Sequence, residues 1–199
     1  SAFAKGTYGR AIRERPLDMA AHHKPICALN GDYYGSDSKS GVVIRNGVLY
    51  RSNADADVLV LYTDGTMRTF TKDAFDADAE MENGAYQAWC FGPSLLNASG
   101  AAKKGFTGRI AGYHPRSAIG YYEPGHYCFV AVDGRSKDSK GMTLDQLAKL
   151  MESLGCKLAY NLDGGQSSAL VFDNTLINSP SNGGRLVTDI LFIAEPALG

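Results

Sequence analysis

The residues best suited to chemistry lie between positions 158 and 168, where an apolar run ends in a polar turn. The turn carries a carboxamide, a carboxylate, two glycines and two hydroxyls, in the order Asn161, Asp163, Gly164, Gly165, Ser167 and Ser168. Glycine lets the backbone turn sharply and lets a ligand approach bare amide groups. This combination is typical of a site for anions or sugars. An ordinary strand-ending turn, the alternative, does not need all of these groups.

Three other apolar segments end in similar clusters, namely Asn30-Gly31-Asp32, Gly92-Pro93-Ser94 and Asp133-Gly134-Arg135. In sheets with crossover helices, ligand sites lie beyond the carboxyl ends of the strands. We therefore expect one cleft that holds Asp32, Asp133, Asp163 and Arg135. The alternative is that these clusters are unrelated surface turns.

Basic residues near these clusters indicate a phosphorylated ligand. Arg116 follows His114-Pro115 and directly precedes an apolar strand, and Arg185 closes the polar, glycine-rich loop 178–185. The planar guanidinium matches phosphate in a bidentate geometry. Each arginine alone would fit a surface ion pair, but together with the glycine turns they predict phosphate binding.

Several other motifs are weaker. Ser167 stands in a sequence that partly mimics a serine nucleophile elbow, but a strand rather than a helix is expected to follow it. The two glycines at 164–165 lack the lysine of a P-loop. The acidic pairs at 55–57 and 76–78 fit solvated loops better than calcium ligands. The four cysteines contain no CxxC pair, so we expect no structural zinc site.

Composition limits the class of protein. The 199 residues include 20 basic and 21 acidic side chains, for a net charge of −1, and the hydrophobic share is 44%. These values fit a globular protein, and they give no general basic field for nucleic acid. No apolar run approaches the roughly 18 residues needed to span a bilayer. The chain does not begin with Met, so we expect a processed or recombinant fragment whose targeting signals have been removed.

The pattern along the chain predicts many strands and few helices. Expected strands are 26–30, 42–44, 48–50, 58–62, 67–70, 85–91, 117–122, 126–132, 158–162, 168–172, 176–177 and 190–194. Asn-Gly, Asp-Gly and Pro-Gly turns predict three hairpins among them, 42–50, 58–70 and 117–132. A short helix is expected at 16–23. A second should begin after Thr143, with Gln146 completing a capping box, and end before Gly155. Strand 129–132, this helix and strand 158–162 resemble a βαβ crossover.

Seven motifs in this order resemble those of the phosphodiester glycosidase family. They are Asn30-Gly31-Asp32-Tyr33-Tyr34, Phe91-Gly92-Pro93, the segment 114–120 from His114 to Gly120, Val132-Asp133-Gly134-Arg135, Gly141-Met142-Thr143, the segment 161–168, and Asn178-Ser179-Pro180. The resemblance covers about residues 26–194. It implies an α+β fold with a large, mixed, mostly antiparallel β-sheet core, a few flanking helices and the βαβ-like crossover. It also implies one domain over 1–199 that hydrolyses the C1–O bond of a sugar-1-phosphodiester, of the α-N-acetylglucosamine-1-phosphate type.

The chain departs from the family pattern at two positions. Asp32 stands where the first motif commonly has a second glycine, and Gln166 stands where a later motif commonly has a third. Both add a polar side chain to the expected cleft. We therefore expect the substrate to differ from that of other family members more than the reaction does. Because the chain begins close to the first motif, we expect a leading strand of the family domain to be missing.

The resemblance implies roles for the candidate residues. Asp163, or secondly Asp133, would act as base toward water or as nucleophile, and Asn161 would assist with Asn30 in orienting the sugar. The phosphodiester would be held by Arg116, Arg135 and Arg185, the amides of Gly164 and Gly165, and the hydroxyls of Ser167 and Ser168. The remaining candidates for substrate or phosphate binding are Asp32, Gly92, His114 and Asn178.

The scheme requires no metal or other cofactor, although carboxylate-rich strand ends have the chemistry to hold a divalent cation. The expected partner is a glycan or sugar-phosphodiester, with no nucleic acid and no membrane segment. The chain looks like bacterial members linked to exopolysaccharide or the cell envelope, so we expect an extracytoplasmic location. Two alternatives stay open: a non-catalytic polysaccharide-binding module, and a metal-dependent phosphodiesterase that cuts P–O.

Overall fold

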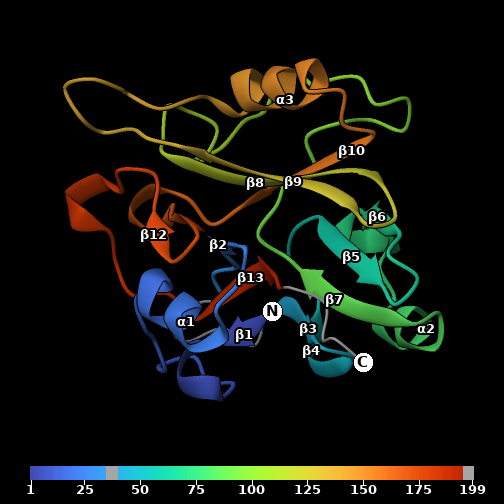
Figure 1. Ribbon diagram of the computed structural model, residues 1–199. Coiled ribbons are helices and arrows are strands. Elements are labelled where there is room, and N and C mark those ends of the chain that lie inside the picture. The colour runs from blue at the N-terminus through green and yellow to red at the C-terminus, as the bar shows by residue number, and fades with distance from the viewer. Residues whose placement is uncertain (35–39, 195–199) are drawn as a thin grey trace.

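The computed structural model describes residues 1–34 and 40–194, which form three antiparallel β-sheets with helices on their outer faces (Figure 1). Every strand pair in these residues is antiparallel. The expected mostly antiparallel core with few helices is confirmed. The single large mixed sheet is wrong, because short twisted strands joined by tight turns divide into separate packed sheets.

The first sheet has the strand order β1-β13-β2-β11-β12. Its strands are β1 (Ala2–Phe3), β13 (Asp189–Ile193), β2 (Cys27–Asn30), β11 (Leu170–Phe172) and β12 (Thr175–Leu176). Helix α1 (Pro16–His23) covers this sheet and buries Met19 and Ala20 against Ala28 and Ile190. The predicted helix at 16–23 and the hairpin between β11 and β12 are confirmed.

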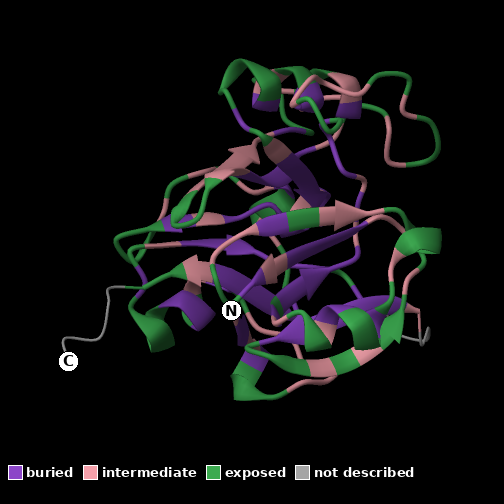
Figure 2. Cartoon of the chain, turned by 90° about the vertical axis from the view of Figure 1, so that its right-hand side faces the viewer, coloured by how far each residue is buried: buried purple, intermediate pink, exposed green. Residues whose placement is uncertain are grey.

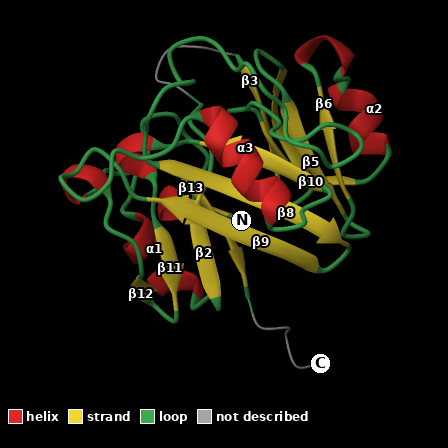
Figure 3. Cartoon of the chain, turned by 90° about the horizontal axis from the view of Figure 1, so that it is seen from above, coloured by secondary structure: helices red, strands yellow, loops and turns green. Residues whose placement is uncertain are grey.

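The second sheet, with the order β10-β8-β9, lies beneath helix α3 (Figure 3). It consists of β10 (Leu158–Leu162), β8 (Arg116–Glu123) and β9 (His126–Val132), and α3 spans Leu144–Ser153. The predicted capping box is confirmed, since the Thr143 side chain accepts from the Gln146 amide and the Gln146 side chain from the Thr143 amide. Because β9 and β10 are both antiparallel to β8, they run parallel to each other on its two sides. The βαβ-like crossover therefore skips one strand.

The third sheet has the order β4-β3-β7-β5-β6. Its strands are β4 (Val48–Asn53), β3 (Gly41–Arg45), β7 (Ala85–Trp89), β5 (Val58–Tyr62) and β6 (Met67–Phe70). The predicted Asn-Gly hairpin is present, with positive φ at both Asn46 and Gly47, as its turn type requires. Helix α2 (Ala77–Glu82) was not expected. Asp76 caps it by accepting from the amides of Asp78 and Ala79, which explains one of the acidic pairs.

One apolar cluster joins the three sheets at the centre of the molecule (Figure 2). It includes Leu29 of β2, Trp89 of β7, Ile119 of β8 and Tyr160 of β10, each no more than 2% exposed. Short 3₁₀ turns at Ala4–Gly6, Lys72–Ala74, Gly165–Ser167 and Ser181–Gly183 complete the described elements. Burial of this cluster holds the sheets in one arrangement and so places the ends of β2, β7 and β10 beside one another.

All four cysteines are free thiols, and Cys128 Sγ lies 3.7 Å from Cys156 Sγ. In the described part of the chain, no helix has both the length and the apolar character needed to cross a bilayer.

Candidate active site

A cleft of about 430 Å³ opens at the ends of strands β7, β9 and β10 and the start of β8. In the described ranges four arginines line it, namely Arg109, Arg116, Arg135 and Arg185. The other lining residues are Tyr33, Phe91, Ile110, His114, Pro115, Asp163, Gly164, Gly165 and Gln166. Antiparallel pairing places the start of β8 beside the ends of its neighbours, because Arg116 pairs with Val132 and Ser117 with Leu162. Local strand pairing therefore gathers these three segments at one edge.

The expected convergence of four charged residues occurs only in part. Asp163 and Arg135 line the cleft, and Asp32 lines a small adjoining recess that shares Asp163 with it. Asp133 is absent from the lining of both. Asp163 is thus the one carboxylate among the described residues that line the cleft.

Asp163 is held in place by three neighbours. Its Oδ2 accepts from Arg185 Nη2 at 2.5 Å, and the Ser167 hydroxyl and the Gly164 amide also stabilise the charged form. The Asp163 side chain is 10% exposed, and this burial raises the pKa of its carboxyl above the ordinary value despite those contacts. A carboxyl with a raised pKa and a fixed orientation is suited to proton transfer.

Arg185 forms the side of the cleft next to Tyr33. Its Nε donates to Ser167 Oγ at 2.5 Å, and its guanidinium lies over the Tyr33 ring at 5.2 Å from the centroid. The Arg185 side chain is nevertheless 39% exposed. Ser167 is almost fully buried behind it, so Ser167 positions Arg185 rather than facing the cleft.

Arg116 lies deeper than the sequence predicts. Only 3% of the residue is exposed, and its guanidinium donates to the carbonyls of Met142, Ile110 and Gly112. Burial, and secondly the charge of Arg135, lower the pKa of Arg116 to about 10. Arg116 therefore orders the surrounding loop and contributes positive charge to the cleft, with much of its donor capacity already used.

Arg135 and His114 contact each other elsewhere in the cleft lining. Arg135 Nη2 donates to His114 Nδ1 at 3.0 Å, and burial lowers the pKa of His114 below its ordinary value. A neutral ring with an accepting Nδ1 fits this contact. The exposed guanidinium of Arg109, whose carbonyl is 3.4 Å from His114 Nε2, makes no hydrogen bond or ion pair within the described residues. Arg109 and Arg135 are therefore the cations best placed for a ligand.

The two glycines after Asp163 permit close packing of the turn. A Cβ on Gly164 would lie 2.6 Å from the Pro115 carbonyl oxygen, and Gly165 adopts a φ of +63°. The Gly165 amide donates to the same Pro115 oxygen at 3.0 Å. This amide therefore does not point freely at a phosphate, contrary to the expectation, because it anchors the turn to the start of β8.

Asn30 is a buried connector and does not reach the cleft. It is fully buried, its Nδ2 donates to the Asp163 carbonyl at 2.7 Å, and its Oδ1 accepts from Ser117 Oγ and the Ala169 amide. The expected role in orienting the sugar is replaced by a structural one. Asn30 links β2 to the turn that carries Asp163.

Asn161 and Gly92 make a similar connection. Asn161 is fully buried and its Nδ2 donates to the Gly92 carbonyl at 2.7 Å, next to the cis peptide bond between Gly92 and Pro93. Neither residue lines the cleft. They join the end of β7 to β10, and an assisting catalytic role for Asn161 is not consistent with its burial.

Asp133, Asn178 and Ser168 form a third connection, away from the cleft. The Asp133 carboxylate accepts from Asn178 Nδ2 at 3.0 Å and from the Ser179 amide, and Asn178 Nδ2 also contacts the Ser168 carbonyl. The Ser168 hydroxyl is buried without a partner in the described residues. None of these three residues lines the cleft, and their contacts fasten the 178–185 loop that carries Arg185.

Asp32 lines the recess and is 5% exposed. Its carboxylate accepts from the amides of Tyr33 and Cys90, and burial raises its pKa to about 7. The side chain thus occupies space that a second glycine would leave open, and it joins β2 to the end of β7.

The sequence prediction omitted several cleft residues. Arg109 lies in the loop 103–113, which shows no periodicity or motif, and Ile110 beside it was likewise undetectable. Tyr33 and Phe91 belong to recognised motifs but received no role, because only packing shows that their rings face the cleft. Within the described residues, no group of three or more His, Cys, Asp or Glu side chains is arranged to hold a metal ion.

Comparisons with known proteins place this geometry in context. The family model for phosphodiester glycosidases matches residues 23–194. The SPbeta prophage-derived uncharacterized protein YomE of Bacillus subtilis is 34% identical over 198 residues, and the match covers 95% of this chain and 31% of YomE. The chain therefore spans about a third of the length of that relative.

Two solved structures share the fold. The catalytic domain of zebrafish N-acetylglucosamine-1-phosphodiester α-N-acetylglucosaminidase, auto-inhibited by its pro-peptide, superposes with a TM-score of 0.75 at 25% identity, over 92% of this chain and 68% of that one. A putative exported protein from Burkholderia pseudomallei has a TM-score of 0.67 at 15% identity, over 98% and 70% of the two chains. With the family model matching most of the sequence, the chain belongs to the phosphodiester glycosidase family.

Proposed function

We propose that the cleft hydrolyses the glycosidic C1–O bond of a sugar-1-phosphodiester, with α-linked N-acetylglucosamine as the sugar and a cell-envelope or exopolysaccharide component as the source. The observation that carries the proposal is the position of Asp163. It is the single carboxylate among the described residues of a cleft whose walls present Arg109, Arg135 and Arg185. Membership of the phosphodiester glycosidase family supports the reaction class. An extracytoplasmic location would fit such a substrate.

The arginines account for binding of the phosphodiester. Arg109 and Arg135 present guanidinium groups to the cleft, and His114 holds Arg135 in position through its Nδ1. The buried charge of Arg116 adds to the positive potential behind them. Guanidinium groups bind phosphate oxygens in bidentate fashion, and they stabilise the negative charge that develops on the departing phosphate.

Asp163 accounts for activation of water. Glycosidases with poor leaving groups use two carboxyl groups, one of which protonates the departing oxygen. A phosphate departs as a stable anion, so one carboxylate is sufficient. Asp163 would take a proton from water as the water oxygen bonds to C1 and the C1–O bond breaks, giving the free sugar and a phosphomonoester. Attack by Asp163 itself on C1, followed by hydrolysis of the ester, would give the same products. Neither route calls on a metal ion.

Hydrolysis of a synthetic methyl diester of N-acetylglucosamine 1-phosphate in ¹⁸O-water tests this proposal. We expect wild type to release N-acetylglucosamine carrying ¹⁸O at C1, and Asp163→Asn to lose about 100-fold or more of this turnover. Asp173→Asn is the matched control, since its carboxylate is exposed in the turn between β11 and β12, outside the cleft, and it should retain most activity.

Two results would overturn the proposal. Release of N-acetylglucosamine 1-phosphate, with chelator-sensitive turnover, would indicate a phosphodiesterase that cuts P–O. Binding of the diester without turnover by folded wild type would indicate a polysaccharide-binding module.

A further inference from the structure

Two further hollows adjoin the cleft through shared lining residues. The recess beside it, lined by Arg13, Leu186 and Thr188, shares Tyr33, Asp163 and Arg185 with the cleft. The recess in turn shares Arg13 with a hollow formed by residues 9–13 of the N-terminal loop. The three concavities are therefore consecutive, with Asp163 at the first junction and Arg13 at the second.

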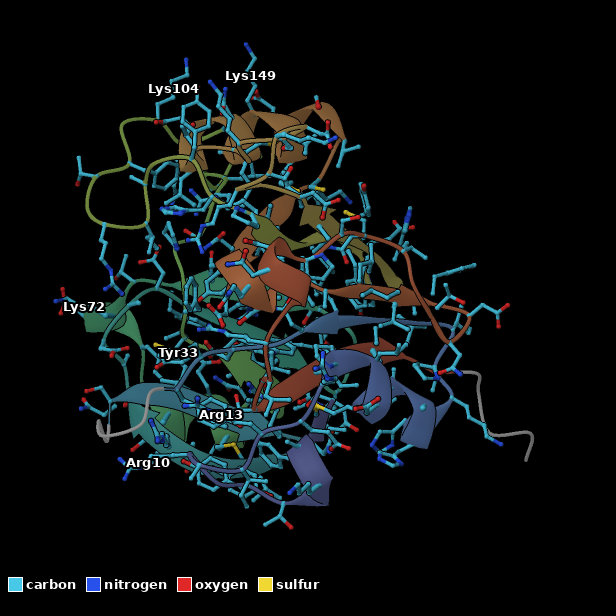
Figure 4. All side chains as sticks on the ribbon, turned by 90° about the vertical axis from the view of Figure 1, so that its left-hand side faces the viewer. Arg10, Arg13, Tyr33, Lys72, Lys104 and Lys149 are labelled. Atoms are coloured by element: carbon cyan, nitrogen blue, oxygen red, sulfur yellow. The ribbon has the colours of Figure 1, made fainter. Side chains whose placement is uncertain are left out.

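Arginines line this path from one end to the other. Arg109 and Arg135 stand in the cleft, Arg185 at the first junction, Arg13 at the second and Arg10 in the outer hollow. Figure 4 shows Tyr33, Arg13 and Arg10 following one another along one face. We call these five arginines the arginine track.

Most of the cationic charge of the track is uncompensated. In the part of the chain that the structure describes, the guanidinium groups of Arg10, Arg13 and Arg109 make no hydrogen bond or ion pair. Arg185 is paired with Asp163, and the recess carboxylate of Asp32 is bound by two backbone amides. One phosphodiester in the cleft carries a single negative charge, which the two positive charges of Arg109 and Arg135 already exceed. Arg10 and Arg13 are therefore left for further anionic groups beyond Asp163.

We propose that the arginine track binds a polymer whose sugar units are joined by phosphodiesters, so that the enzyme acts on a chain and holds further phosphates at Arg13 and Arg10 while one lies in the cleft. This inference rests on the proposed function and names its substrate class. A sugar-phosphate chain presents one negative charge per repeat along its length, which a row of cations on one side matches. Single-stranded nucleic acid fits less well, because its binding uses several free aromatic faces along the path, and the one aromatic ring that the described parts of the cleft and the recess share, Tyr33, already has Arg185 over one face.

Kinetics on substrates of two lengths test the proposal. The probes are the methyl diester of N-acetylglucosamine 1-phosphate and a hexamer of N-acetylglucosamine 1-phosphate units joined by phosphodiesters. Arg13→Gln and Arg10→Gln should each raise KM for the hexamer about 10-fold, the size of one charge-assisted contact, and leave KM for the methyl diester unchanged. Lys149→Gln is the control, because it removes an exposed positive charge on α3, far from Arg10 and Arg13 (Figure 4).

Equal effects of Arg13→Gln on both substrates, or no effect on either, would overturn the arginine track and leave the proposed function intact. If wild type hydrolyses neither substrate, the proposed function fails, and binding is measured by fluorescence anisotropy with a labelled hexamer. Weaker hexamer binding by Arg10→Gln and Arg13→Gln but not Lys149→Gln would then still support the track. Equal or tighter binding of a dT hexanucleotide would overturn the choice of a sugar-phosphate chain.

Discussion

Two arginine–aspartate pairs connect the sheets of this protein, and their surroundings differ. Arg185 and Asp163 are 2.5 Å apart at the cleft wall, with side chains 39% and 10% exposed. Arg45 and Asp189 are 2.6 Å apart inside the molecule, with side chains 1% and 0% exposed. The first pair can exchange partners with a ligand, whereas the second is out of reach of solvent and ligand alike.

The buried pair is enclosed by further contacts. Arg45 also donates to the carbonyls of Ile44 and Ala88 and lies over the Trp89 ring, and Asp189 Oδ1 accepts from the Asp32 amide. These bonds join β3 and β7 of the third sheet to β13 and β2 of the first. Burial of an ion pair costs desolvation free energy that full hydrogen bonding offsets, so removal of one partner is far more damaging than at a surface. The two pairs have the same residue types, and the exposed fraction of their side chains distinguishes the structural pair from the pair that a ligand can reach.

The largest effect expected is on stability, from Arg45→Gln. Removing the guanidinium leaves Asp189 buried without its ion partner, which should lower the free energy of unfolding by about 3–5 kcal/mol. Urea unfolding followed by tryptophan fluorescence measures it, through the single Trp89. If the free energy of unfolding falls by less than about 1 kcal/mol, the Arg45–Asp189 pair behaves like a surface pair, and burial does not distinguish it from Arg185–Asp163.

The matched change at the cleft, Arg185→Gln, should act on turnover. We expect about 100-fold lower kcat on the methyl diester, because Asp163 loses its orienting partner and the cleft loses a cation. The free energy of unfolding should change by only about 1 kcal/mol or less, as for a partly exposed pair. Unchanged kcat with a large loss of stability would reverse the assignment of the two pairs.

Gly31→Ala tests how tightly the buried pair is packed. A Cβ at position 31 would lie 2.7 Å from Asp189 Cγ and closer still to Oδ1, so the carboxylate must shift. We expect a loss of about 1–3 kcal/mol in the free energy of unfolding, with turnover on the methyl diester unaffected. Gly125→Ala is the control for a glycine-to-alanine change without a steric clash, because a Cβ there would meet no atom within 4 Å. Its φ of +80° adds backbone strain, so this control overstates the cost of an unclashed alanine. A smaller loss at Gly31 than at Gly125 would contradict tight packing.

The smallest effect concerns pH and Asp32, which lies beside the buried pair. Its carboxyl has a folded-state pKa of about 7, above the ordinary value of 3.8, because it is buried. The folded protein therefore binds a proton that the unfolded chain releases, so stability falls as pH rises between these two values and levels off above the higher one. From about pH 6 to about pH 7.5 this group should remove about 1 kcal/mol from the free energy of unfolding. Denaturant unfolding at several pH values measures the free energy of unfolding of wild type and of Asp32→Asn. The wild-type value should fall more steeply between about pH 6 and about pH 7.5, and the same pH dependence in both proteins would contradict the prediction.

Local sequence patterns were sufficient to predict most of the helices and strands. Thr143 and Gln146 defined the start of α3, and the Asn46-Gly47 turn defined the hairpin of β3 and β4, because caps and two-residue turns depend on neighbouring residues alone. Helix α2 was missed because six residues carry too little periodicity. The division into three sheets was missed because strand partners far apart in the chain leave no mark on local sequence.

The candidate site divides in the same way. The residue types and glycine spacing around Asp163 indicated an anion or sugar site, and the motif order indicated the family, because both are properties of the chain itself. Which polar groups face the cleft depended on packing between sheets. Asn30, Asn161 and Asp133 have the same chemistry as residues that bind ligands, yet each is bonded to the backbone of another segment. Buried polar groups must find partners wherever the fold brings them, which is why these three residues became connectors. Arg109 carried no signal in its own loop, and only the anchoring of that loop to Arg116 of β8 placed its exposed guanidinium in the cleft lining.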